Sequence, residues 1–146
     1  MPFGKGGVWQ APRIVTVHFP TNAAILTSPN VAAFIADADY EVVSVAEIHE
    51  TIGSDGSAVT LDVVKATGTQ AASAGTSMLA STFSLKSTLN TVVRKDRGGG
   101  GLATARTTCQ LAKGDRVAIK FGGTLTAVTG VCVSLVLVPF QRKPKW

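Results

Sequence analysis

The chain has 146 residues, of which 45% are hydrophobic and only 16% charged, with a formal net charge of +5. This length fits one domain that buries its own core without a metal or disulfide staple. Charged content below the ~25% typical of soluble domains favours a protein that covers part of its surface in an oligomer or larger assembly. The longest apolar run, residues 131–140, is far shorter than the ~20 residues of a membrane helix, and no signal peptide is predicted, so no membrane partner is expected.

The prolines divide the chain. All six lie near the ends, and residues 30–138 contain none. Because proline lacks the amide donor of a sheet ladder, this distribution predicts a sheet core with extended arms. We therefore expect an N-terminal arm and first strand at 1–30, a β-sandwich domain at 31–140 and a basic C-terminal tail at 141–146.

Three stretches alternate with the period of a half-buried strand. The expected inward side chains are Val15, Val17 and Phe19 in residues 13–19, Val59, Leu61 and Val63 in residues 59–64, and Val117, Ile119 and Phe121 in residues 116–121. Residues 131–140 are apolar on both faces, as in a strand covered on both sides. The second cover could be a neighbouring subunit.

Two segments between these strands are less regular. Ser28 and Pro29 form a good helix start, but residues 31–36 can equally be a short strand. In residues 41–50 the alternation slips, since Val43 and Val45 share one face before Ala46 and Ile48 take over. A β-bulge between Val45 and Glu47 would explain the slip.

Turn residues predict two hairpins and one surface loop. "GSDG" at 53–56 would join the strand before it to the strand at 58–66. Gly114 in "AKGD" would join the strand at 116–121 to a strand "ARTTCQL" that places Ala105, Thr107, Cys109 and Leu111 on one face. The small residues at 68–77 predict a surface loop. Many short strands at regular spacing indicate an all-β fold, a sandwich or jelly roll.

The two cysteines, Cys109 and Cys132, lie in alternating apolar stretches. The expected state is two buried, reduced thiols, because free cysteine is among the most buried residue types. A cross-strand disulfide is the alternative.

The chain carries no recognisable catalytic pattern. The two histidines, His18 and His49, have no second ligand at metal spacing, so no metal is expected. The acidic pairs Asp37/Asp39 and Glu47/Glu50 occupy turn and strand positions rather than a paired-carboxylate arrangement. No nucleophile elbow, phosphate loop or dinucleotide fingerprint is present. We therefore expect neither an enzyme nor a cofactor.

The segment "RKDRGGGGLATAR" raises the question of nucleic acid. Arg94, Lys95, Arg97 and Arg106 surround four glycines, but no aromatic residue lies between Phe83 and Phe121 to stack on bases. Nucleic acid is therefore not expected as a partner, and a steep salt dependence of DNA binding would be the sign of one. The glycines are interpreted as a pliable loop whose basic neighbours reach acidic surface on another subunit.

The chain ends supply the other candidate contacts. Trp9 and Trp146 are the only tryptophans, and tryptophan is enriched at interface hot spots. They either dock on a partner with the basic tail or fold back on the home domain. The full set of candidate interface residues is Trp9, Arg94, Lys95, Arg97, Arg106, Arg142, Lys143 and Trp146.

Several short motifs over residues 34–140 belong together. They are a strand ending in His49, a turn with Gly53 and Gly56, and the segments Val59–Lys65, Ala74–Leu79, Leu89–Val92 and Leu111–Ala118. As a set they resemble small structural proteins of tailed bacteriophages and prophages, the head decoration or cement proteins. The "RKDRGGGGLA" segment departs from that pattern.

The resemblance implies a jelly-roll-like β-sandwich on the outer surface of the virion capsid, made in the cytoplasm of the bacterial host. Its partners would be the major capsid protein, whose subunits it bridges, and itself, as a homo-oligomer. The alternative function is a host-adhesion or carbohydrate-binding module of a head fibre or tail.

Overall fold

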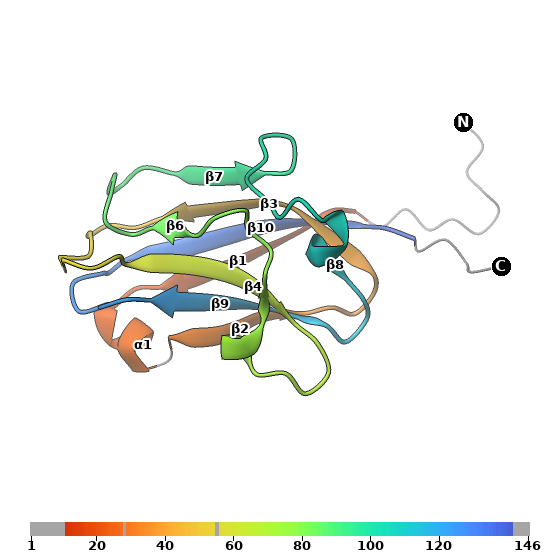
Figure 1. Ribbon diagram of the computed structural model, residues 1–146, viewed down its shortest axis with the longest axis horizontal. Helices are drawn as coiled ribbons and strands as arrows, with labels where there is room; N and C mark the ends of the chain where they lie inside the picture. The colour runs from red at the N-terminus through yellow and green to blue at the C-terminus, as the bar shows by residue number, and fades with distance from the viewer. Residues whose placement is uncertain (1–10, 28, 55, 142–146) are drawn as a thin grey trace.

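The computed structural model describes residues 11–27, 29–54 and 56–141. Two antiparallel sheets pack face to face, which confirms the expected all-β sandwich (Figure 1). The strands are β1 (Arg13–Phe19), β2 (Asn30–Ile35), β3 (Tyr40–Ile48), β4 (Thr60–Ala66), β5 (Thr76–Ser77), β6 (Phe83–Ser84), β7 (Val93–Asp96), β8 (Gln110–Leu111), β9 (Arg116–Gly122) and β10 (Val131–Pro139). The helix α1 (Asn22–Thr27) and short 3-10 turns at Ala72–Ala74 and Arg106–Cys109 complete the fold.

Each sheet has five strands. In the first, the β3 sheet, the order is β1-β10-β3-β7, and β8 also pairs with β3. In the second, the β4 sheet, the order is β2-β9-β4-β5, and β6 also pairs with β4. Hydrogen-bonded neighbours are therefore mostly distant in the chain, as with β1 and β10.

Both predicted hairpins are wrong. The turn at 53–56 joins β3 to β4, and the turn at Gly114 joins β8 to β9, but each pair is divided between the two sheets. The conformational part of the second prediction holds, because Gly114 has a φ of +93°. Turn residues specify a chain reversal, but they do not specify whether the returning strand pairs with its predecessor or crosses to the facing sheet.

The predicted inward faces are confirmed where alternation is regular. In β1, Val15 and Val17 face inward and Phe19 is buried. The residues predicted to face inward in the other two stretches are all buried, namely Val59, Leu61, Val63, Val117, Ile119 and Phe121. These side chains meet the inward residues of β10, among them Val133 and Leu135, in one core between the sheets. Period-two alternation works here because each of these strands has one face against that core.

The β-bulge in β3 lies earlier than predicted. Ser44 pairs with Val136 and Val42 with Leu137, so Val43 is the extra residue. The shift reverses the phase of the rest of the strand. Val45, Glu47 and His49 are buried inside the sandwich, whereas Ala46 and Ile48, predicted to take over the inward face, pair with outward residues of β10.

Two other local predictions change. Arg106–Cys109 form a 3-10 turn rather than part of a strand, and this turn buries Cys109 while leaving Arg106 at the surface. The helix precedes Ser28 instead of following it, since the backbone N–H of Ala24 is capped by Thr21 Oγ1 (3.3 Å). The strand alternative for residues 31–36 is confirmed by β2.

The outer faces of the sheets differ. The loop at 67–75 folds back over the β4 sheet and buries Val64 and Ala118. Arg116 Nη2 holds it by donating to the carbonyl oxygens of Gly68 (2.9 Å) and Gln70 (2.6 Å). On the β3 sheet, the outward residues of β10 are only half-buried. Cys132 is one of these, so the expectation of two buried thiols holds for Cys109 alone, and both cysteines are free.

The two long sides of the sandwich differ as well. On one side the segment 97–109 connects the edge at β7 with the residues after β5, and we call this the closed side. The backbone N–H of Ala80 donates to Gly101 (3.0 Å), and Leu79 forms a bridge with Leu102. On the other side, the open side, the edge strands β1 and β2 contact each other directly.

Candidate functional site

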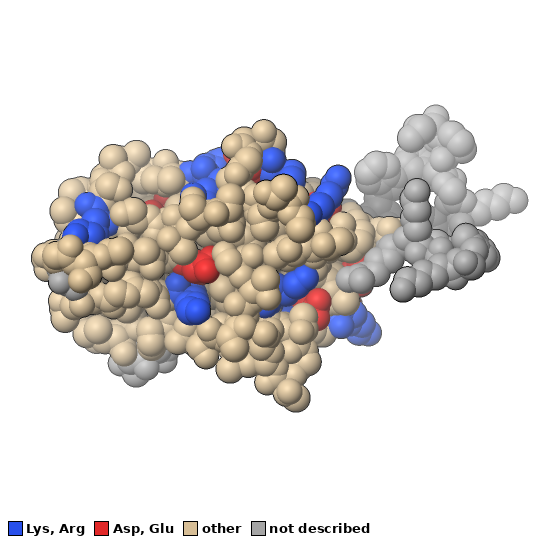
Figure 2. Space-filling view, in the orientation of Figure 1, with Lys and Arg blue, Asp and Glu red and all other residues tan. Residues whose placement is uncertain are grey.

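The basic residues around the glycines start on an edge strand. β7 carries Arg94 and Lys95, and Figure 2 shows basic side chains gathered along the molecular edge over β7. Arg94 is exposed, and its Nη1 donates to Ser44 Oγ (3.3 Å). Lys95 Nζ donates to Ser81 Oγ (3.0 Å) and lies 5.1 Å from the ring centroid of Phe83, a cation–π distance. Arg94 is therefore the more available of the two charges.

Arg97 and Arg106 converge on a buried carboxylate, that of Glu41. The side chain of Glu41 is 3% exposed, and its Oε1 accepts a hydrogen bond from Arg106 Nε at 2.6 Å. Arg97 Nε lies 4.0 Å from the same oxygen. The hydrogen bond and charge of Glu41 raise the pKa of Arg106. Glu41 is thus the shared acidic partner of two arginines, and a charged side chain is buried at low cost only when it is paired in this way.

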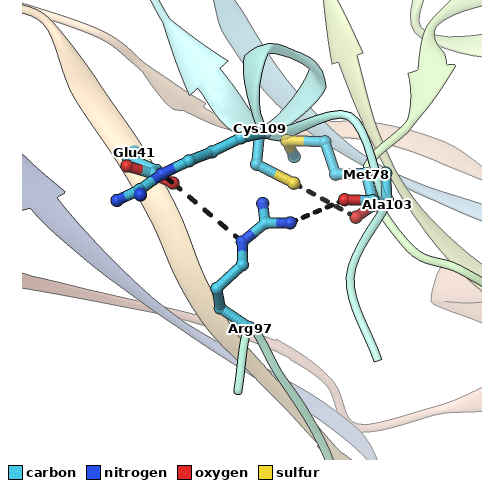
Figure 3. Close-up of polar contacts among 6 residues, drawn as sticks. Glu41, Met78, Arg97, Ala103 and Cys109 are labelled. Carbon is cyan, nitrogen blue, oxygen red and sulfur yellow. Dashed lines mark hydrogen bonds and ion pairs between the residues drawn. The ribbon is translucent and has the colours of Figure 1, made fainter. Parts of the chain in front are cut away.

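Arg97 ties the segment 97–109 to the domain. Its Nη1 donates to the carbonyl oxygen of Ala103 (2.6 Å), while its Nε and Nη2 are buried without a hydrogen bond. Figure 3 shows the guanidinium lying between Glu41 and Ala103. The neighbouring Cys109 Sγ donates to the carbonyl oxygen of Met78 (3.3 Å), and burial raises the pKa of this thiol. The thiol is therefore protonated at neutral pH and a poor nucleophile.

The four glycines form a turn that is anchored at its end. The backbone N–H of Gly101 donates to the carbonyl oxygen of Asp96 (3.1 Å), and Leu102 is buried. A β-carbon at Gly101 would lie 2.7 Å from Lys95 Cα, so this position needs glycine. Gly98, Gly99 and Gly100 are exposed. Within this tip the backbone N–H of Gly100 donates to the carbonyl oxygen of Arg97 (3.3 Å), and the pliability predicted for the glycines stays a prediction.

The predicted interface residues fall into three groups. Arg97 and Arg106 are directed at Glu41 of their own chain, although Arg106 remains 68% exposed. Arg94 and Lys95 lie beside them on the edge strand. Trp9, Arg142, Lys143 and Trp146 lie outside the described residues. Contact with another subunit stays a prediction for all of them.

A second polar cluster was missed by the sequence analysis. Glu47 and His49 have completely buried side chains, and His49 Nδ1 lies 2.9 Å from Glu47 Oε2. Glu47 Oε1 and His49 Nε2 have no hydrogen-bond partner. Burial raises the pKa of Glu47, and the interaction with His49 opposes that shift only in part. The i, i+2 spacing on a strand was the available signal, because it places both side chains on one face.

In the described ranges, no group of three or more His, Cys, Asp or Glu side chains could hold a metal ion. Within the same ranges, no helix is both long and apolar enough to cross a membrane. Comparison of the chain with protein-family models, with curated proteins and with solved structures gave no match.

Proposed function

We propose that the sandwich is a jelly roll, and its strand order carries this proposal. With β5 and β6 taken as one strand and β7 and β8 as another, the described residues form eight strands. The first pairs with the last, the second with the seventh, the third with the sixth, and the fourth with the fifth. Such nested pairing is that of a long hairpin rolled into two sheets, the jelly roll of viral capsid and lectin domains.

On this fold and the motif resemblance we propose that the protein is a phage head decoration protein. It would bind the outer surface of the assembled capsid and bridge major capsid protein subunits. The shared motifs occupy positions that build the fold. His49 is buried, a β-carbon at Gly53 would strike Val59, and Gly114 makes the positive-φ turn before β9. Because these motifs build the fold, their resemblance to those of head decoration proteins supports the same fold for this chain. A β-sandwich of this kind suits a structural role.

Decoration requires many modest contacts that act together. Each contact raises the effective concentration of the next, so a small domain can bind a lattice tightly. A protein that binds only the assembled lattice stabilises it by linkage. The exposed large apolar residues supply contact area of this kind, and they are Ile14, Leu26, Ile35, Ile52, Leu89 and Val92.

The test is the composition of intact particles. Purified virions analysed by mass spectrometry should contain the protein in a simple ratio to the capsid subunit, and electron microscopy should show it on the outer shell. The variant Arg94→Ser/Lys95→Ser should bind particles more weakly, most clearly at low salt. Arg97 is left intact because it is internal. Absence of the protein from purified virions would refute the proposal.

The alternative, a carbohydrate-binding module of a head fibre or tail, needs exposed rings for sugar stacking. Phe19, Tyr40, Phe83 and Phe121 are buried in the core. Phe34 and Phe140 are half-buried. Binding on a glycan array at micromolar affinity would favour this alternative over decoration.

A further inference from the structure

The open side of the sandwich is the place where the core is least covered. Most core residues of β3, β4, β9 and β10 are fully buried, but Val15 and Val17 of β1 and Val31 and Phe34 of β2 are only partly buried. The two most exposed large apolar side chains are on the same strands, Ile14 at 71% and Ile35 at 67%. Apolar surface gathered along one side indicates an interaction surface.

The free sheet edges are not equally open to another strand. Natural proteins protect edges by short length, charge or bulges. β5 and β6 have two residues each, and β7 carries the charged residues Arg94, Lys95 and Asp96. The pairing of β2 with β9 is irregular between Ala32 and Phe34. None of these three edges suits a long regular ladder.

β1 has no such protection. It pairs with β10 over seven residues without a register shift, and its other edge has no strand partner among the described residues. Pro12 and Pro20 lie directly outside it and limit a new ladder to Arg13–Phe19. The single cation in the strand is Arg13 at one end, which is bound to Asp37 (2.8 Å). A row of unpaired backbone groups on such a strand is a template for another strand.

We propose that this edge binds the β1 strand of a second copy, antiparallel across a twofold axis at Thr16. Val15 then faces Val17 of the other copy on the core side, which completes the cover of both valines. On the outer face Ile14 meets His18, and Thr16 meets its own equivalent. The two Arg13 side chains lie roughly 20 Å apart, since six strand positions separate them.

The strand itself favours a second copy over another partner. In this register Val15 meets Val17 on the buried face, Arg13 lies opposite Phe19 at the ends of that face, and no like charges meet. Twofold dimers with self-complementary surfaces are the commonest assemblies of soluble proteins. Pairing joins two β3 sheets into one continuous sheet. This inference does not depend on the decoration function, because it concerns the free protein.

The first experiment measures mass in solution. Sedimentation equilibrium of the full chain should give a dimer, and Thr16→Lys should raise its dissociation constant about tenfold or more, since two lysines would face each other at the axis. Thr16→Glu should do the same. Native mass spectrometry of an equimolar mixture should recover a Lys–Glu heterodimer. Thr76→Lys, on the exposed β5 edge, is the matched control and should stay dimeric.

The second experiment fixes the register. Thr16→Cys in a Cys132→Ser background should form a disulfide between copies under mild oxidation, because directly opposed strand residues approach closely enough. Thr76→Cys in the same background should not. Circular dichroism checks that each variant is folded. A wild-type monomer, a cyclic trimer, a Thr16→Lys variant that stays fully dimeric or equal cross-linking at Thr76 would each overturn the proposal.

Discussion

The closed and open sides of the sandwich solve the same problem in different ways. Both must cover the gap between two sheets. On the closed side, the chain covers it with its own segment 97–109, which buries Leu102 and Cys109 and is held by Arg97. On the open side, β1 and β2 meet directly and leave apolar side chains partly exposed. Stability should therefore depend on the closed side, and association on the open side.

The largest effect is expected from Glu41→Ala. The change leaves the buried Nε and Nη2 atoms of Arg97 without a counter-charge and should lower the free energy of unfolding by ~3 kcal/mol, measured by urea denaturation. Glu50→Ala, an exposed glutamate beyond the end of β3, is the control and should change it by less than about 0.5 kcal/mol. Equal effects of the two would show that Glu41 does not hold the closed side.

A direct comparison of the sides comes from two truncations. Leu102→Ala removes a buried side chain on the closed side and should cost ~3 kcal/mol of unfolding free energy. Ile14→Ala on the open side should cost less than about 0.5 kcal/mol in the monomer, because this side chain is 71% exposed. Denaturation at low protein concentration measures both. A larger loss from Ile14→Ala would reverse the comparison.

The glycine turn gives a smaller effect. Gly101→Ala forces a β-carbon against the backbone of β7 and should cost ~1–2 kcal/mol. Gly99→Ala is the matched control, because its β-carbon would meet only Asp96 O at 3.9 Å. Thermal unfolding of both variants should show a lower midpoint for Gly101→Ala alone. Equal midpoints would mean that the turn adjusts freely at both positions.

The smallest expected effect is a pH dependence of the unfolding free energy that comes from Glu47. This residue lies near the closed side, since it pairs with Val93 of β7. Burial raises the pKa of Glu47 above its ordinary value of 4.5, so the folded state holds this proton more tightly than the unfolded state. Stability from this group is therefore lost as pH rises from 4.5 through the raised pKa. Relative to Glu47→Gln, the wild type should become less stable over that range, measured by urea denaturation at each pH. A constant difference would contradict the assignment.

Sequence reasoning predicted correctly which side chains of a regular strand face the core, because this depends on the pattern within that strand alone. Val117, Ile119 and Phe121 face the core as expected, because strict alternation leaves one choice of face. The predicted inward face of β3 was right at Val45 but wrong from Ala46 onward, because the bulge lies at Val43 and not between Val45 and Glu47. The buried pair of Glu47 and His49 was missed for that reason.

Features that depend on distant segments were beyond sequence reasoning. Glu41 and Arg97 come together only because β3 and β7 are neighbours in one sheet. The charge of Arg97 was predicted to reach another subunit, but nothing local showed that it turns inward. The two hairpin predictions failed for a similar reason. Gly114 allows the chain to reverse, but it does not determine which sheet the next strand joins.

The position of β10 bears on how the protein acquires its structure during synthesis. β10 lies between β1 and β3 at the centre of its sheet, yet follows both of them in the chain. Until residues 131–139 leave the ribosome, β1 has no neighbour to pair with and much of the apolar interior stays open to water. Pairings between such distant segments close large loops and form slowly. The β3 sheet should therefore be completed only after β10 has left the ribosome, and the sandwich cannot close its core before that point.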